Sequence, residues 1–127
     1  MTRASSAPNS PTVDPVNTVH LVGRVSWGPE VRVLPSGDEV VQLRVVVPRQ
    51  APRGGGRSGE GRAGERRQVD AIEVACWSAR TRAAARRLSV DDYADLEGSL
   101  HRRFYAGTQG RVSRYEVEAR RLRRVRG

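Results

Sequence analysis

The chain has 127 residues, which is enough for one small domain, and 37% of them are hydrophobic. Its formal net charge is +9, and all 23 basic residues are arginines because the sequence contains no lysine. A single cysteine excludes an internal disulfide and a thiol-based zinc site. No apolar run reaches the roughly 18 residues that a membrane span requires.

Residues 1–15 are rich in serine, proline and threonine, and we predict that they form a disordered N-terminal leader. They lack the apolar centre of a secretory signal peptide. We therefore expect a cytoplasmic protein.

The first half of the remaining sequence has the pattern of β-strands. Residues 16–27 alternate between apolar and polar side chains and predict a first strand, with Gly23 at a bulge or a sharp bend. A short apolar run at 31–34 is followed by the turn residues PSGD at 35–38. The β-branched run at 39–48 then predicts a second strand that is antiparallel to the first.

The second half predicts three more strands and one helix. Residues 67–77 form a third β-branched run, and Ser78 suits the N-cap of an alanine-rich helix at 79–88. Alternating residues within 89–105 predict a fourth strand, and 114–125 predict a fifth. The order β-β-β-α-β-β predicts an all-β protein with one helix, the five-stranded Greek-key barrel known as the OB-fold.

Arginine and glycine dominate residues 48–67, between the second and third predicted strands. Neither flank is long enough to fold alone, so we predict a single domain over 16–126 with a long flexible loop at 48–67. Guanidinium groups bind phosphate in bidentate fashion and stack on bases. The composition therefore predicts a polyanionic partner, with this loop as an electrostatic arm that becomes ordered on phosphate.

The strands also carry a set of motifs at a consistent spacing. They are Asn17, Gly23, Pro29-Glu30-Val31-Arg32 and Pro35-x-Gly37 in the first half, then LEGSLHRRFY and YEVEARRL in the second. This pattern resembles the bacterial single-stranded DNA-binding proteins over about residues 16–125. The resemblance implies a homotetrameric or dimeric OB-fold that wraps single-stranded DNA without sequence preference. It also implies a role in DNA replication, repair or recombination and an association with the nucleoid.

The resemblance implies that nine side chains contact nucleic acid. They are Arg32, Arg49, Arg53, Arg57, Trp77, Arg103, Phe104, Tyr105 and Arg111. Two ring positions of the family, in the loop after the second strand and at Ala71, hold no ring here. Trp77 could instead be a core tryptophan and Tyr105 an exposed hairpin residue, while Phe104 is expected on the opposite side of its strand from Tyr105. The family requires no ring at the position of Trp27, and we expect this side chain in packing or at an interface.

Two other functions remain open from the sequence. The missing rings are compatible with a protein-interaction or oligomerisation module that has lost tight DNA binding. The Arg/Gly segment is also compatible with RNA binding. The chain ends ARRLRRVRG, without the acidic tip of replicative family members, so we expect a short or divergent paralogue.

No enzymatic activity is expected. His20 and His101 lack metal-ligand spacing, and each is most simply a residue on the surface of a strand. The pair Asp91–Asp92 is typical of a solvated turn, since neighbouring side chains in an extended segment point apart. We therefore expect no catalytic residue, metal, cofactor or small-molecule substrate.

Overall fold

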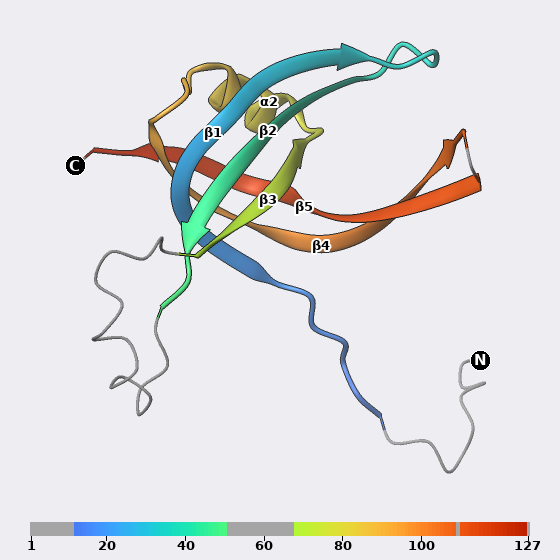
Figure 1. Cartoon of the computed structure of the whole chain (residues 1–127), viewed down its shortest axis with the longest axis horizontal. Coiled ribbons are helices and arrows are strands. Elements are labelled where there is room, and N and C mark those ends of the chain that lie inside the picture. The colour runs from blue at the N-terminus through green and yellow to red at the C-terminus, as the bar shows by residue number, and fades with distance from the viewer. Residues whose placement is uncertain (1–11, 51–67, 109, 127) are drawn as a thin grey trace.

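The protein is described by a computed structural model that covers residues 12–50, 68–108 and 110–126, with the backbone alone for residues 105–107 (Figure 1). Residues 1–11 of the predicted leader and 51–67 of the predicted loop lie outside the described residues. Five strands and one helix follow in chain order: β1 Val19–Val33, β2 Glu39–Pro48, β3 Val69–Cys76, α2 Ala79–Arg86, β4 Tyr93–Gly107 and β5 Gly110–Val125.

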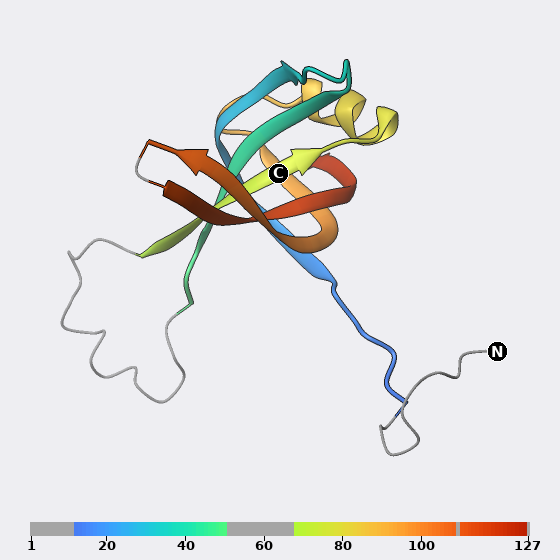
Figure 2. The same cartoon turned by 90° about the vertical axis from the view of Figure 1, so that its right-hand side faces the viewer.

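The strands close into one barrel in the order β1-β2-β3-β5-β4 (Figures 1 and 2). All neighbouring strands are antiparallel except β3 and β5, which are parallel. This topology, with the helix between the third and fourth strands, is that of the five-stranded OB-fold. The predicted fold class is therefore confirmed.

The core is built from the inward-facing side chains of alternate strand residues. Leu43 of β2 lies beside Val74 of β3, and Val74 lies beside Val117 of β5. Leu96 of β4 lies beside Leu122 of β5 in the same way. All five side chains are buried, and burial of this apolar surface is the main force that stabilises the barrel.

β1 is one strand rather than the two short runs that the sequence suggested. It continues through Gly28 and Pro29, with register shifts on either side of Trp27. Of the two alternatives expected at Gly23, a bulge or a sharp bend, the bulge is absent, because Gly23 pairs with Ala94 in regular register. Glycine is required there for another reason: a Cβ atom would lie 2.5 Å from the carbonyl oxygen of Val46 on β2.

The helix α2 begins where the sequence predicted. The Ser78 hydroxyl accepts a hydrogen bond from the Thr81 backbone N–H at 3.1 Å, which is the expected N-cap contact. The helix ends at Arg86, two residues before the predicted end, and the buried side chains Ala85 and Leu88 join the core. No helix in the described part of the chain is long and apolar enough to cross a membrane.

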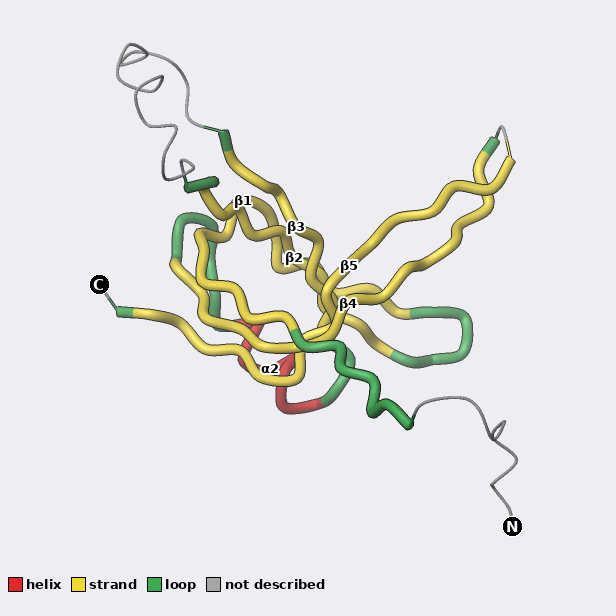
Figure 3. Tube along the Cα trace, turned by 90° about the horizontal axis from the view of Figure 1, so that it is seen from below, coloured by secondary structure: helices red, strands yellow, loops and turns green. Residues whose placement is uncertain are grey.

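The β4–β5 hairpin is longer than the sequence indicated. β4 extends to Gly107 and β5 begins at Gly110 instead of residue 114, so their pairing runs to Gly107 opposite Gly110. Figures 1 and 3 show that this hairpin projects well beyond the barrel. Both faces of its outer half are therefore free of the core.

Cys76 provides a test of the packing. Its side chain is fully buried, and burial raises the pKa of the thiol to about 12. The thiolate is the reactive form, so native protein at pH 8 should react with a thiol reagent far more slowly than protein unfolded in guanidinium chloride. Stoichiometric labelling of native protein at the rate of the unfolded chain would contradict this packing.

Candidate nucleic-acid interface

A groove crosses the outer face of the barrel between β1, β2, β3 and the β5 half of the hairpin. Its volume is about 360 Å³. Nine residues line it: Trp27, Glu30, Arg32, Gln42, Arg44, Glu73, Val112, Arg114 and Glu116. We call it the outer-face groove.

Trp27 is the one ring among the groove-lining residues, and the sequence analysis did not identify it as a binding residue. It lies opposite Arg44 in the β1–β2 pairing and is 37% exposed. The Arg44 guanidinium lies over the indole, 5.5 Å from the ring centroid. Arg44 in turn donates a 2.8 Å hydrogen bond from Nε to Glu73 Oε2, which fixes the guanidinium. Trp27 was expected in packing or at an interface, and the structure places its ring among the residues that line the groove.

Trp77 and Arg103, both predicted from the sequence, are brought together at a second position. The Arg103 guanidinium lies 5.3 Å from the centroid of the Trp77 ring. Arg103 also donates from Nε to Glu116 Oε2 at 2.5 Å, and this carboxylate is buried. The indole Nε1 is buried and has no hydrogen-bond partner among the described residues. Trp77 is half-buried, so its ring is neither a fully buried core side chain nor a fully exposed stacking surface.

The arginines that line the groove, and Arg103 beside it on the same face of the hairpin, differ in how far a carboxylate balances their charge. Arg44 and Arg103 each bind a glutamate, as described above. Arg32 donates only to the Gln42 side chain at 3.3 Å, and Arg114 is exposed. Within the described residues, neither Arg32 nor Arg114 has a carboxylate at ion-pair distance. The groove lining contains three arginines and three glutamates, so it is less cationic than the sequence suggested.

Arg49 does not line the outer-face groove. Its guanidinium donates to Asp70 from Nη2 and Nε, at 3.0 and 3.1 Å, and to Gln68 at 3.3 Å. The hydrogen bond to Asp70 raises the pKa of Arg49 further. Arg49 is therefore part of an ion pair across the ends of β2 and β3.

Three other predicted contacts are not described at the level of side chains. Arg53 and Arg57 lie outside the described residues. The backbone of Tyr105 pairs with Val112 in the hairpin, but its side chain is not described. Their roles remain predictions.

Phe104 and Arg111 lie on the other face of the hairpin from the groove. Directly paired residues share a face, and successive residues of a strand alternate between faces. Arg103 pairs with Arg114, which lines the groove, whereas Phe104 pairs with Ser113 on the opposite face. The nine predicted residues therefore do not form one surface.

Residues 16–125 match the single-strand binding protein family. The chain belongs to this family. Single-stranded DNA-binding protein A of Bacillus subtilis (strain 168) is 33% identical over 105 residues, which cover 82% of this chain and 56% of that protein. The chain thus spans just over half the length of this curated relative.

A solved structure has the same fold. The Plasmodium falciparum SSB complex with ssDNA superposes with a TM-score of 0.70 at 16% identity, covering 91% of this chain and 99% of that one. At this level of identity the likeness establishes the OB-fold alone. The family membership rests on the sequence matches over residues 16–125.

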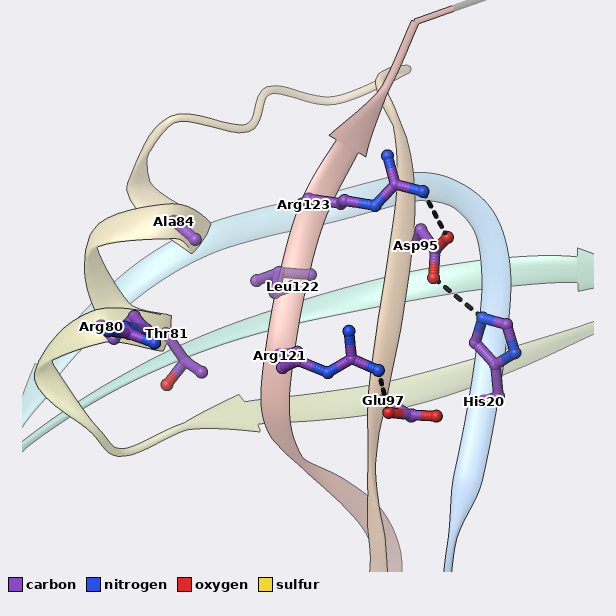
Figure 4. A pocket seen from close by; sticks show the side chains of 9 residues that line it. All are labelled: His20, Arg80, Thr81, Ala84, Asp95, Glu97, Arg121, Leu122 and Arg123. Atoms are coloured by element: carbon purple, nitrogen blue, oxygen red, sulfur yellow. Dashed lines mark hydrogen bonds and ion pairs between the residues drawn. The ribbon is translucent and has the colours of Figure 1, made fainter.

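This member of the single-strand binding protein family has a second pocket, between α2 and strands β1, β4 and β5 (Figure 4). Asp95 lies 2.9 Å from His20 Nε2 and accepts a 3.1 Å hydrogen bond from Arg123, while Arg121 donates to Glu97. The contact with His20 lowers the pKa of Asp95, and the hydrogen bond from Arg121 lowers the pKa of Glu97. These carboxylates balance the two β5 arginines, so ion pairs join β4 and β5 at this pocket, and the contact between His20 and Asp95 adds β1.

Proposed function

We propose that this protein binds single-stranded DNA along the outer-face groove, without sequence preference, in replication, repair or recombination. One observation carries the proposal: the Trp27 ring opens into a groove flanked by guanidinium groups, in a chain of the single-strand binding protein family. A base stacked on an aromatic ring contributes roughly 1–3 kcal/mol, and every base offers a π-face. Stacking of this kind explains binding without base-specific contacts.

The arginines in and beside the groove have two different roles in this proposal. Arg44 and Arg103 are held by glutamates and lie over Trp27 and Trp77, so they position the two rings. Arg32 and Arg114 have no carboxylate partner in the described part of the chain and are free to bind phosphates. Phosphate contacts on either side of a stacked base hold the strand in the groove.

The loss of two family rings left an interaction module open as an alternative when only the sequence was considered. Trp27 changes that assessment, because it supplies a ring that the family pattern does not provide. Contacts of the strand with Arg53 and Arg57, and stacking of a base on Tyr105, would add to the affinity that the groove provides. We propose that the protein acts in the cytoplasm at the nucleoid.

We also propose that the chain assembles as a dimer or tetramer. The outer face of β1 and β4 exposes Val22 and Tyr93, the latter by 52%. Val22 and Tyr93 share this face with His20, Arg24, Asp95 and Glu97, so an interface between copies there would combine apolar contacts with polar ones. Sedimentation equilibrium should give a mass of at least twice the 14.0 kDa of the chain, and a monomer at micromolar concentration would contradict this proposal.

The proposed function is tested by equilibrium titration of fluorescently labelled oligo-dT across a salt series. Each phosphate contact should contribute about 0.7 to the slope of log affinity against log salt, so the groove arginines alone predict a slope of at least about 1.4. Mixed-sequence DNA should bind with similar affinity, and a matched RNA should compete more weakly. No binding at low salt would refute the proposal, and tighter binding of the RNA would reassign it.

A further inference from the structure

A small pocket lies where the C-terminal end of α2 meets the last residues of β5. Its volume is about 250 Å³, and four arginines line it: Arg87, Arg123, Arg124 and Arg126. We call it the helix–strand pocket. Figure 1 shows this end of β5 on the other side of the barrel from the β4–β5 hairpin. None of the described residues lines both this pocket and the outer-face groove, so the two sites are separate.

The floor of the helix–strand pocket is apolar. Ala84 and Leu88 reach it from α2 and the segment after the helix, and Leu122 reaches it from β5. Ala84 points from α2 towards β5, where Leu122 lies (Figure 4). Leu88 and Leu122 belong to the barrel core and Ala84 packs against it, so the floor has a fixed shape. An aliphatic side chain placed on this floor would lose its contact with water, which favours binding.

The rim of the pocket differs from the outer-face groove in the balance of its charge. Within the described residues, no carboxylate lies at ion-pair distance from Arg87 or Arg126, and both residues are exposed. Arg123 and Arg124 each pair with an aspartate, at 3.1 and 3.6 Å. No acidic residue in the described part of the chain lines the pocket, whereas three glutamates line the groove. The rim therefore keeps two unbalanced positive charges.

The floor and the rim together select the kind of ligand. Clusters of arginine recognise acidic motifs, because a planar guanidinium binds both oxygens of a carboxylate. Among the described residues, no tryptophan, tyrosine or phenylalanine lines the pocket, so it offers no ring on which a base could stack. An acidic peptide, in contrast, combines carboxylates with aliphatic side chains that match an aliphatic floor. The pocket thus fits a segment of protein better than a nucleic-acid strand.

We propose that the helix–strand pocket is a docking site for an acidic segment of a partner protein. An aliphatic side chain of that segment lies on the apolar floor, and its carboxylates bind Arg87 and Arg126. Arg123 and Arg124 remain paired with their aspartates. A partner bound here leaves the outer-face groove open, so this inference does not depend on the proposed function.

The test measures the fluorescence anisotropy of a labelled peptide, GSEELEEGS, titrated with the full chain at low salt. We expect saturable binding. The double variant Arg87→Gln/Arg126→Gln should weaken it by at least about tenfold, because two charged hydrogen-bond donors are lost. A peptide with glycine in place of the leucine should bind at least about fivefold more weakly, because the floor then has no apolar partner. Both arginines are exposed, so the variant should keep the native fold, which thermal unfolding verifies.

The matched control is Arg102→Gln/Arg120→Gln. It removes the same net charge from two exposed arginines of β4 and β5 that do not line the pocket. It should bind the peptide like the parent protein. If it weakens binding as much as the double variant does, net charge explains the binding and the pocket is not a site. Equal binding of the leucine and glycine peptides would also overturn the proposal, because the floor would then play no part.

Competition with oligo-dT separates the helix–strand pocket from the groove. Saturating oligo-dT should not displace the peptide, and the double variant should bind oligo-dT like the parent protein. If oligo-dT displaces the peptide, the pocket belongs to a nucleic-acid surface and the docking proposal is wrong. No saturable peptide binding, with oligo-dT still bound, would refute the docking site alone. Peptide binding without oligo-dT binding would refute the proposed function and support the docking site.

Discussion

Replacing Trp27 with alanine is expected to weaken the binding of oligo-dT by roughly 5- to 150-fold, which corresponds to the loss of about 1–3 kcal/mol of stacking. The ring is 37% exposed and lies in the groove beside Arg44. Its removal takes away the stacking surface, whereas the Arg44 guanidinium keeps its hydrogen bond to Glu73. The change is measured by fluorescence anisotropy at a fixed low salt concentration.

Two variants control for indirect effects of this substitution. Trp27→Phe keeps a ring and should retain most of the affinity. Val90→Ala truncates an apolar side chain that is 50% exposed and does not line the groove, so it should leave the affinity unchanged. Thermal unfolding shows whether each variant keeps the native fold. If folded Trp27→Ala binds like the parent protein, the ring serves in packing or at an interface, as the sequence suggested.

Replacing Gly98 with alanine is expected to destabilise the barrel by at least about 3 kcal/mol or to prevent folding. Gly98 lies at the register shift between β4 and β5. A Cβ atom there would lie 2.0 Å from the carbonyl oxygen of Glu118 and 3.0 Å from the Ala119 Cα. Both are backbone atoms of the paired strand, so the two strands would have to separate. Urea unfolding followed by circular dichroism measures the loss.

The same substitution at Gly37 provides the matched control. Gly37 lies in the turn between β1 and β2 with φ of +94°, and nothing lies within 4 Å of an added Cβ. Gly37→Ala therefore incurs only the strain of positive φ, about 1–2 kcal/mol. The free energy of unfolding should rank parent, Gly37→Ala and Gly98→Ala in decreasing order. Equal losses for the two variants would contradict the close strand approach at Gly98.

Local patterns were sufficient to predict the fold. Alternating residues gave the strands, Ser78 gave the start of the helix, and Pro35 to Gly37 gave the first turn. The path of β1 past Gly28 was missed because Gly and Pro normally end a strand. Here the pairing of Glu30 to Val33 with β2 continues the strand, and such pairing depends on residues distant in the sequence.

The site was predicted less completely, for the same physical reason. The side of the sheet on which Trp27 lies depends on the register shifts that flank it, and no local pattern shows those shifts. The sequence also did not show which arginines are paired with a carboxylate, because the partners Arg44 and Glu73 are 29 residues apart in the chain. The expected side of Phe104, in contrast, follows from alternation along a strand, which is a local property: its pairing with Ser113 places it on the face away from the groove.

The most direct test of a base-stacking groove uses the fact that the chain contains only two tryptophans. In the variant Trp77→Phe, Trp27 is the sole tryptophan, and its fluorescence reports contact with a base. We expect saturable quenching on titration with oligo-dT at low salt, with the same midpoint as anisotropy measured on the same samples. Binding by anisotropy without any change in Trp27 fluorescence would show that the strand does not stack in this groove.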